Sequence, residues 1–175
     1  MVYAYYHKLN RTQQRIYEHS DAIATIPVSS PEQYHDDLWQ IHTALENDAR
    51  IDVEHSCNML AKRLTVSLAT PPAKIKVKAK RPSNNYGELH GLYEPAEDGE
   101  NATITLWMRT AQRKQVVAVR TFLRTLLHEL CHHLDYEYLK LADSFHTEGF
   151  YKRESSLFQQ LTRNIDLPSR RKKSD

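Results

Sequence analysis

Residues 116–138 read VVAVRTFLRTLLHELCHHLDYEY, and this stretch decides the fold. Its apolar residues recur at the spacing of one helix face, namely Val116, Val119, Leu123, Leu126, Leu127, Leu130 and Leu134. This period predicts a long helix that begins near Gln112 and buries one side against a core. Two histidines and a glutamate, His128, Glu129 and His132, lie within the same helix and require a chemical explanation.

The segments around this helix predict an α+β fold. Helices are expected at residues 11–24, at residues 30–45, at residues 53–68 and, after the long helix, at residues 148–161. Ser30 and Gln33 match a capping box, with Pro31 in the first turn. Strands are expected at residues 74–80, 88–93 and 102–108. The first of these alternates Ile75, Val77 and Ala79 with lysines, which predicts one solvated basic face.

Three regions follow from this order. Residues 1–70 form a helical N-terminal region of unknown role, residues 71–165 carry the strands and the long helix, and residues 166–175 form a basic tail. The tail, which contains Arg170 and Lys173, is expected to be disordered.

Composition excludes several classes of protein. A chain of 175 residues fits one domain, and two cysteines exclude both a disulfide scaffold and a four-cysteine zinc module. The N-terminus lacks the pattern of a secretory signal, and no apolar run is long enough for a membrane span. We therefore expect a cytoplasmic protein without a membrane partner. The unusual feature is ten histidines, because histidine is the commonest metal ligand.

The sequence His128-Glu129-Leu130-Cys131-His132 is an H-E-x-x-H motif. Residues four apart share a helix face, so both imidazoles can reach one metal ion. Catalytic zinc has three protein ligands and an open position for water, whose pKa it lowers to about 7. Glu129 can then accept the proton from that water. The alternative interpretation is an ordinary solvated helix face.

A third zinc ligand must come from another segment. A metzincin would have a glycine at position 135 and a histidine at position 138, where this chain has Asp135 and Tyr138. The remaining candidates are His146 and Glu148, which lie far enough along the chain to fold back onto the ion. His146 is the better zinc ligand, because it offers a neutral imidazole, whereas Glu148 would give the set of two histidines and one glutamate that is also known for catalytic zinc.

The motif at 128–132, followed by His146-x-x-x-Phe150 at the start of a helix, resembles the SprT-like zinc metallopeptidases and the related WLM and Spartan-type proteases. The resemblance covers about residues 74–162 and includes strands just before the motif helix. It implies a zincin-like fold, one zinc ion held by His128, His132 and His146, and Glu129 as the general base. Thr147 departs from the pattern, since SprT-like proteins often have glycine there.

Several neighbours of the motif have alternative roles. Asp135 either orients a ligand imidazole or is a surface carboxylate, while His133 and Cys131 are expected to be structural. A hydroxyl that stabilises the oxyanion in peptide hydrolysis would come from Tyr136, Tyr138 or Tyr151. The alternative is that all three are half-buried aromatic residues. If Glu148 is not a ligand, it either contacts a metal ligand or interacts favourably with the helix dipole at the N-terminus of the last helix.

The leading hypothesis is a zinc metallopeptidase whose peptide or protein substrate pairs with the strand at 102–108. Basic residues at 74–81 and 109–124, without acidic residues over 101–128, indicate either weak nucleic-acid contact or solvated edges. Two alternatives remain open. One is a zinc-containing, nucleic-acid-associated module with little turnover. The other is a latent protease in which residues 1–70 cover the cleft and Cys57, or an N-terminal histidine or carboxylate, occupies the open zinc position.

Overall fold

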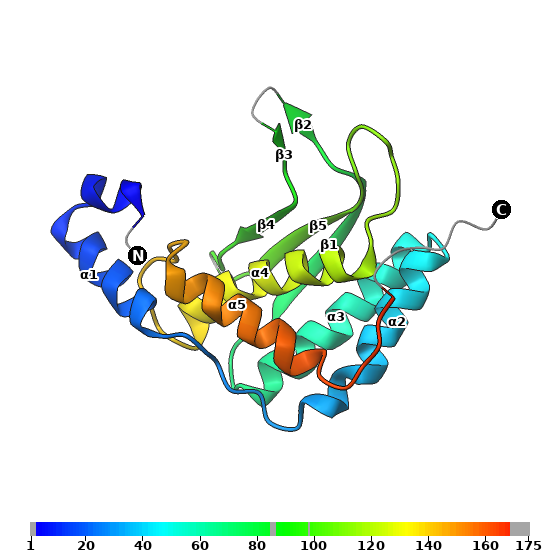
Figure 1. The fold of residues 1–175 in the computed structure, drawn as a ribbon, viewed down its shortest axis with the longest axis horizontal. Helices are drawn as coiled ribbons and strands as arrows, with labels where there is room; N and C mark the ends of the chain where they lie inside the picture. Colours follow the sequence, from blue (N-terminus) through cyan, green and yellow to red (C-terminus); the bar gives the residue numbers. More distant parts are fainter. Residues whose placement is uncertain (1–2, 85–86, 98, 169–175) are drawn as a thin grey trace.

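Helix α4 (Val119–Glu137) lies at the centre of the molecule, with a small sheet on one side and helix α5 (Glu148–Leu161) on the other (Figure 1). The computed structural model describes residues 3–84, 87–97 and 99–168. The apolar stripe of α4 is buried as the periodicity predicts, with Phe122, Leu126 and Leu130 in the main hydrophobic cluster. This packing fixes the opposite side of α4, which carries the H-E-x-x-H motif, relative to the sheet and to α5.

The sheet has three strands in the spatial order β1 (Ala73–Lys80), β5 (Ala102–Arg109) and β4 (Gly91–Glu94). Strand β1 runs parallel to β5, and β4 runs antiparallel to it. The expectation that a peptide pairs with residues 102–108 is wrong, because β5 is the central strand and both of its edges are already paired. The edges of the sheet belong to β1 and β4.

The outer edge of β1 is covered by side chains of α3 (Arg50–Ser67). Asn58 donates to the carbonyl of Ile75 and accepts from its N–H group, at 2.8 and 2.9 Å. One turn earlier on α3, Glu54 accepts from the N–H group of Val77 at 2.7 Å. Side chains of α3 thus take the place of a neighbouring strand, and this edge is closed to another chain.

The predicted strand at 88–93 is interrupted in the structure. Glu88 belongs to a separate hairpin of β2 (Ser83–Asn84) and β3 (Gly87–Glu88), while β4 begins at Gly91. Leu89 and His90 form the link, because the chain leaves the hairpin here and pairs with a different strand, β5. Both link residues reach the cleft beside α4.

The N-terminal helices pack on both ends of this arrangement. A 3₁₀ helix, η1 (Ala4–Lys8), leads into α1 (Arg11–Ala22), which packs against α5. A second 3₁₀ helix, η2 (Pro31–Tyr34), precedes α2 (His35–Glu46), which packs on α3. One hydrophobic cluster includes buried residues of α2, α3, the sheet, α4 and α5.

The prediction of an α+β fold with helices before a three-stranded sheet and two helices after it is confirmed. The capping box at Ser30 is wrong: Ser30 has a positive φ of 48° and makes no capping hydrogen bond, and Gln33 donates to the carbonyl of Ser29 instead. The long helix begins at Val119 and not near Gln112. Val116 forms a β-bridge with Arg109, so the chain at Val116 extends the sheet before the helix starts.

Other boundaries differ from the predictions by a few residues. Helix α3 begins at Arg50 and not at residue 53, whereas α5 has the predicted bounds. The lysines of β1 are exposed and Ile75 and Val77 are buried as predicted, but Ala79 is exposed. Most of the basic tail, residues 169–175, lies outside the described residues. In the described part of the chain, no helix combines the length and the apolar character that crossing a membrane requires.

Candidate metal centre

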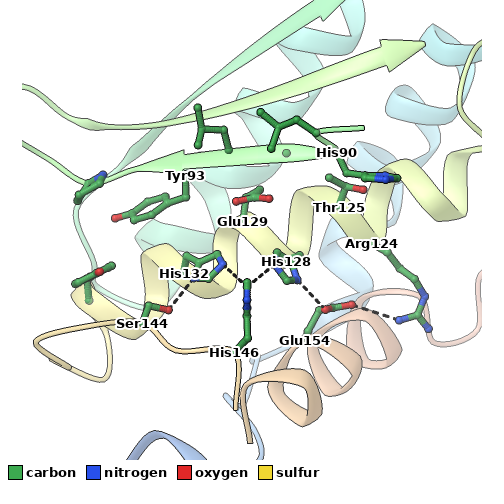
Figure 2. Close-up of a pocket in the computed structure, with 15 residues that line it drawn as sticks. His90, Tyr93, Arg124, Thr125, His128, Glu129, His132, Ser144, His146 and Glu154 are labelled. Atoms are coloured by element: carbon green, nitrogen blue, oxygen red, sulfur yellow. Dashed lines mark hydrogen bonds and ion pairs between the residues drawn. The ribbon is translucent and has the colours of Figure 1, made fainter. Parts of the chain in front are cut away.

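Three histidine side chains converge on one point beside α4 (Figure 2). His128 and His132 project from the same face of α4, as their spacing predicts, and His146 reaches them from the loop before α5. One ring nitrogen of each residue lies within 4.8 Å of the others. Nε2 of His146 lies 3.0 Å from Nε2 of His128 and 3.0 Å from Nε2 of His132.

This arrangement fits a zinc ion. Three nitrogens that each bind zinc at about 2.0–2.1 Å in a tetrahedral site lie about 3.3 Å from one another. The two Nε2 separations of 3.0 Å are close to that value. Imidazole is a typical zinc ligand, and three of them leave one coordination position for water or substrate. His128, His132 and His146 would therefore hold the ion through their Nε2 atoms.

The orientation of His128 is set by Glu154 of α5. Nδ1 of His128 lies 3.1 Å from Oε2 of Glu154, and the dashed lines of Figure 2 continue from this carboxylate to Arg124. Because a carboxylate can only accept, Nδ1 carries the proton. Nε2 then has a free lone pair directed at the ligand cluster, as a metal ligand requires.

His132 is oriented through a longer chain of hydrogen bonds. Its Nδ1 lies 2.7 Å from Oγ of Ser144, and that hydroxyl donates to Oδ2 of Asp135 at 2.8 Å. The hydroxyl therefore accepts from Nδ1 of His132, which again leaves Nε2 free to bind a metal. Asp135 is fully buried and pairs with Arg153, whose Nη2 lies 2.9 Å from Oδ1. Asp135 thus orients His132 indirectly, and Ser144 makes the direct contact.

Burial also keeps two of the three imidazoles neutral. Desolvation, with smaller effects of His128 and His146, lowers the pKa of His132 to about 3. Desolvation and the nearby His128 lower the pKa of His146 as well. Since only a neutral imidazole binds a metal, both groups are in the binding form at neutral pH.

Glu129 lies beside the histidines, between α4 and β4. It is 7% exposed and accepts a hydrogen bond from the backbone of Tyr93. Burial raises its pKa to about 7, against the opposing effects of His128 and of the Tyr93 hydrogen bond. A carboxylate that is buried at the edge of a cleft, with a pKa close to neutrality, is typical of a general acid and base.

Gly91 allows β4 to lie against this carboxylate. A Cβ atom at position 91 would be 2.3 Å from Oε1 of Glu129 and 2.7 Å from its Cγ. Contacts this short exclude any side chain at position 91 unless Glu129 moves. Glycine at position 91 thus allows strand β4 to lie in direct contact with Glu129, the candidate general base on α4.

A cleft of about 630 Å³ opens beside the histidines. One wall is formed by residues 89–93 and Pro95, and the other by residues of α4, α5 and the loop between them. Tyr93 joins the two walls: its ring stacks on His132 at 6.2 Å and on Tyr136 at 5.9 Å between centroids. None of the described lining residues comes from residues 3–70. Cys57 is buried in the core on α3, so the structure does not bring it to the open zinc position.

The other residues singled out in the sequence lie around the site. His133 is buried, with Nε2 2.8 Å from the carbonyl of Pro71 and Nδ1 3.3 Å from the Tyr93 hydroxyl, which is a structural position. Cys131 is buried in the core. Glu148 lies outside the histidine cluster and pairs with Lys152 at 2.7 Å.

The three candidate tyrosines differ in whether they line the cleft. Tyr136 lines the cleft, and its hydroxyl donates to Asp143 at 3.3 Å. Tyr151 stacks on His146 with ring centroids 5.7 Å apart but is not among the lining residues. Tyr138, at the end of α4, is also outside the described lining. Tyr136 is therefore the candidate that can reach a molecule in the cleft.

Sequence reasoning did not find Gly91, Tyr93, Ser144, Arg153 or Glu154. Two of these left a signal in the sequence. Gly91 is one of only four glycines, so each glycine position merits a structural reason. Glu154 follows His146 by eight residues on the predicted last helix, where it can face the motif helix. The buried position of Arg153 has no sequence signal.

Comparison of the chain with protein-family models, curated proteins and solved structures finds no match in any of the three. The resemblance to SprT-like metallopeptidases therefore rests on the motif residues themselves.

Proposed function

We propose that the chain is a zinc-dependent metallopeptidase of the cytoplasm. The observation that carries the proposal is the convergence of three imidazole Nε2 atoms next to a buried glutamate, at the floor of an open cleft. A purely structural zinc site closes all four ligand positions and has no use for an adjacent carboxylate. Here the protein supplies three ligands and a base.

The division of labour follows from the positions of the side chains. A bound zinc ion would polarise the carbonyl of the scissile peptide and make a water molecule more acidic. Glu129, which reaches the cleft without belonging to the ligand cluster, accepts the proton of the attacking water. It then donates this proton to the departing amine. Glu154 and Ser144 hold the ligand imidazoles in the required tautomer.

The peptide is expected to bind along β4. This strand ends the sheet, and Gly91, Leu92 and Tyr93 line the cleft. The opposite edge, on β1, is closed by Asn58 and Glu54. An extended peptide that lies along β4 on the cleft side would run close to the histidines, which would bring a peptide carbonyl next to the metal site. The backbone N–H group of Tyr93 is not available to such a peptide, because it donates to Glu129.

The test uses the purified full chain and the Glu129→Gln variant. Both are loaded with zinc, their metal content is measured, and cleavage of casein and of a quenched fluorescent peptide library is followed. We expect one zinc ion per chain in both proteins and cleavage by the wild type alone. A zinc-loaded wild type that cleaves no protein or peptide, with or without DNA, would overturn the peptidase proposal.

A row of lysines on β1 favours a second candidate function. Lys74, Lys76, Lys78 and Lys80 are all exposed on this strand. Such a row suits the phosphates of a nucleic acid, and the alternative is a zinc-containing, nucleic-acid-associated module with little turnover. Binding of a labelled duplex at several salt concentrations tests it. A steep loss of affinity with salt that becomes shallower when two of the lysines become glutamine would support it, and an unchanged salt dependence would contradict it.

A further inference from the structure

We propose that the segment over residues 3–23 positions the third metal ligand, with Tyr5 and Asp21 as the positioning residues, and that the buried Arg153 joins this segment to the residues that orient His132. The inference rests on the proposed metal centre and gives the N-terminal region a role in it. The segment lies more than a hundred residues from His146 in sequence, yet it contacts the ligand-bearing loop and the start of α5 at several points.

The first contact is made to the ligand residue itself. The hydroxyl of Tyr5 donates to the backbone carbonyl of His146 at 2.9 Å. Beside it, the ring of Tyr17 on α1 packs against Phe145 with centroids 6.3 Å apart. His146 itself is exposed, whereas the next residue, Thr147, is fully buried. The Tyr5 hydrogen bond supplies a fixed point at the ligand.

The second contact fixes the start of α5, directly after the ligand. The N–H group of Gly149 donates to Oδ1 of Asp21 at 2.9 Å. The two backbones are so close that a Cβ atom at position 149 would lie 2.4 Å from the carbonyl oxygen of Asp21. Because the end of α1 contacts the first turn of α5, the N-terminal segment fixes the position of the loop that carries His146 relative to α4.

The third contact joins α1 to a second ligand. Arg153 has no exposed surface, and its Nη1 donates to the carbonyls of Ser20 and Ile23, both at 2.6 Å. Its Nη2 donates to Asp135, from which the chain of hydrogen bonds continues through Ser144. The guanidinium therefore connects the end of α1 with the residues that orient His132.

These contacts act before a metal arrives. A flexible loop loses conformational freedom when its histidine binds a metal, and that loss weakens binding. A loop already held at His146 and Gly149 loses less, so the N-terminal segment is expected to raise metal affinity without touching the ion. The expected effect of removing one contact is about fivefold, the contribution of a single hydrogen bond.

The experiment compares four variants of the full chain: Tyr5→Phe, Tyr6→Phe, Asp21→Ala and Asp21→Asn. Tyr6→Phe is the matched control, because the Tyr6 hydroxyl bonds to Glu18 and not to the ligand loop. Asp21→Asn keeps an oxygen that can accept from Gly149, whereas Asp21→Ala does not. Affinity for Zn²⁺ is measured by competition with a chelator, with the Co²⁺ absorption spectrum as a report on ligand geometry and denaturant unfolding as a report on stability.

We expect Tyr5→Phe and Asp21→Ala to weaken zinc binding about fivefold each, and Tyr6→Phe and Asp21→Asn to bind like the wild type. Unchanged affinity in both Tyr5→Phe and Asp21→Ala would overturn the inference, as would equal losses in Tyr5→Phe and Tyr6→Phe. A wild type that binds zinc but cleaves nothing overturns the peptidase proposal alone, because the affinity comparison remains valid.

Discussion

Glu154 accepts a hydrogen bond from Nδ1 of His128 at 3.1 Å, although the two residues lie on different helices. Glu154 is mostly buried, with 13% of its side chain exposed, and Arg124 lies 3.6 Å from its other oxygen. Arg124 in turn packs over the ring of Phe158 at 4.2 Å. The carboxylate is therefore held on both sides, and it can orient the first ligand of the proposed metal site.

The first prediction follows from this pair. Glu154→Ala removes the acceptor that fixes the tautomer and direction of His128, and loss of such a partner typically reduces metal affinity by about 10- to 100-fold. Glu154→Gln keeps an acceptor oxygen and is expected to lose less. Zinc affinity measured by chelator competition tests the order. Equal affinities in Glu154→Ala and the wild type would show that the hydrogen bond does not orient the ligand.

A second prediction separates the two candidates for the third ligand. His146 points its Nε2 at the other two histidines, whereas Glu148 pairs with Lys152. His146→Ala is expected to lose bound zinc, and Glu148→Ala is expected to retain it at the wild-type ratio of metal to protein. Elemental analysis after dialysis is the measurement. The reverse pattern would assign the third ligand to Glu148.

The part of the site that the sequence predicts is the part that depends on local geometry. The spacing of His128 and His132 alone places both imidazoles on one side of a helix, whatever surrounds it. The bounds of α5 follow in the same way from its own periodicity and from Thr147, which caps the helix by accepting from the N–H group of Phe150. Spacing alone leaves both His146 and Glu148 possible, and His146 is favoured first by the chemistry of imidazole as a zinc ligand and then by the family resemblance.

The parts that escape prediction depend on contacts distant in the chain. Arg153 looks like a surface residue of a charged helix, but it donates to two oxygens of Ser20 on α1, to the carbonyl of Ile23 just after that helix, and to Asp135. Gly91 is opposite Glu129 only because β4 packs on α4. Ser30 fails as a cap for a local reason: its positive φ turns the chain before Pro31, and the hydroxyl makes no capping hydrogen bond.

A third prediction concerns the contact between β4 and the proposed base. In Gly91→Ala the new methyl group would be 2.3 Å from Oε1 of Glu129, so the carboxylate or the strand must shift. The histidines are not displaced directly. We expect zinc content to remain, and kcat to fall by about 100-fold, as for a misplaced catalytic group. Glu94→Ala, on the same strand but outside the cleft lining, serves as a control for general damage to β4. Wild-type kcat in Gly91→Ala would mean that Glu129 is not held by this strand.

The last prediction concerns the stability of the metal-free protein as a function of pH. Burial raises the pKa of Glu129 from 4.5 to about 7, so the folded protein binds this proton more tightly than the unfolded chain does. The contribution of Glu129 to the free energy of unfolding therefore decreases as the pH rises from 4.5 to 7, and the full decrease is reached above pH 7. Glu129→Gln has the same shape without the charge and avoids that decrease. At about 1.4 kcal/mol per pKa unit, the variant is expected to be more stable than the wild type by up to about 3 kcal/mol at pH 8, and of similar stability at pH 4.

Urea unfolding in the presence of a chelator at the two pH values measures the difference. A variant less stable than the wild type at pH 8 would contradict the prediction, because it would mean that the ionised carboxylate stabilises the fold.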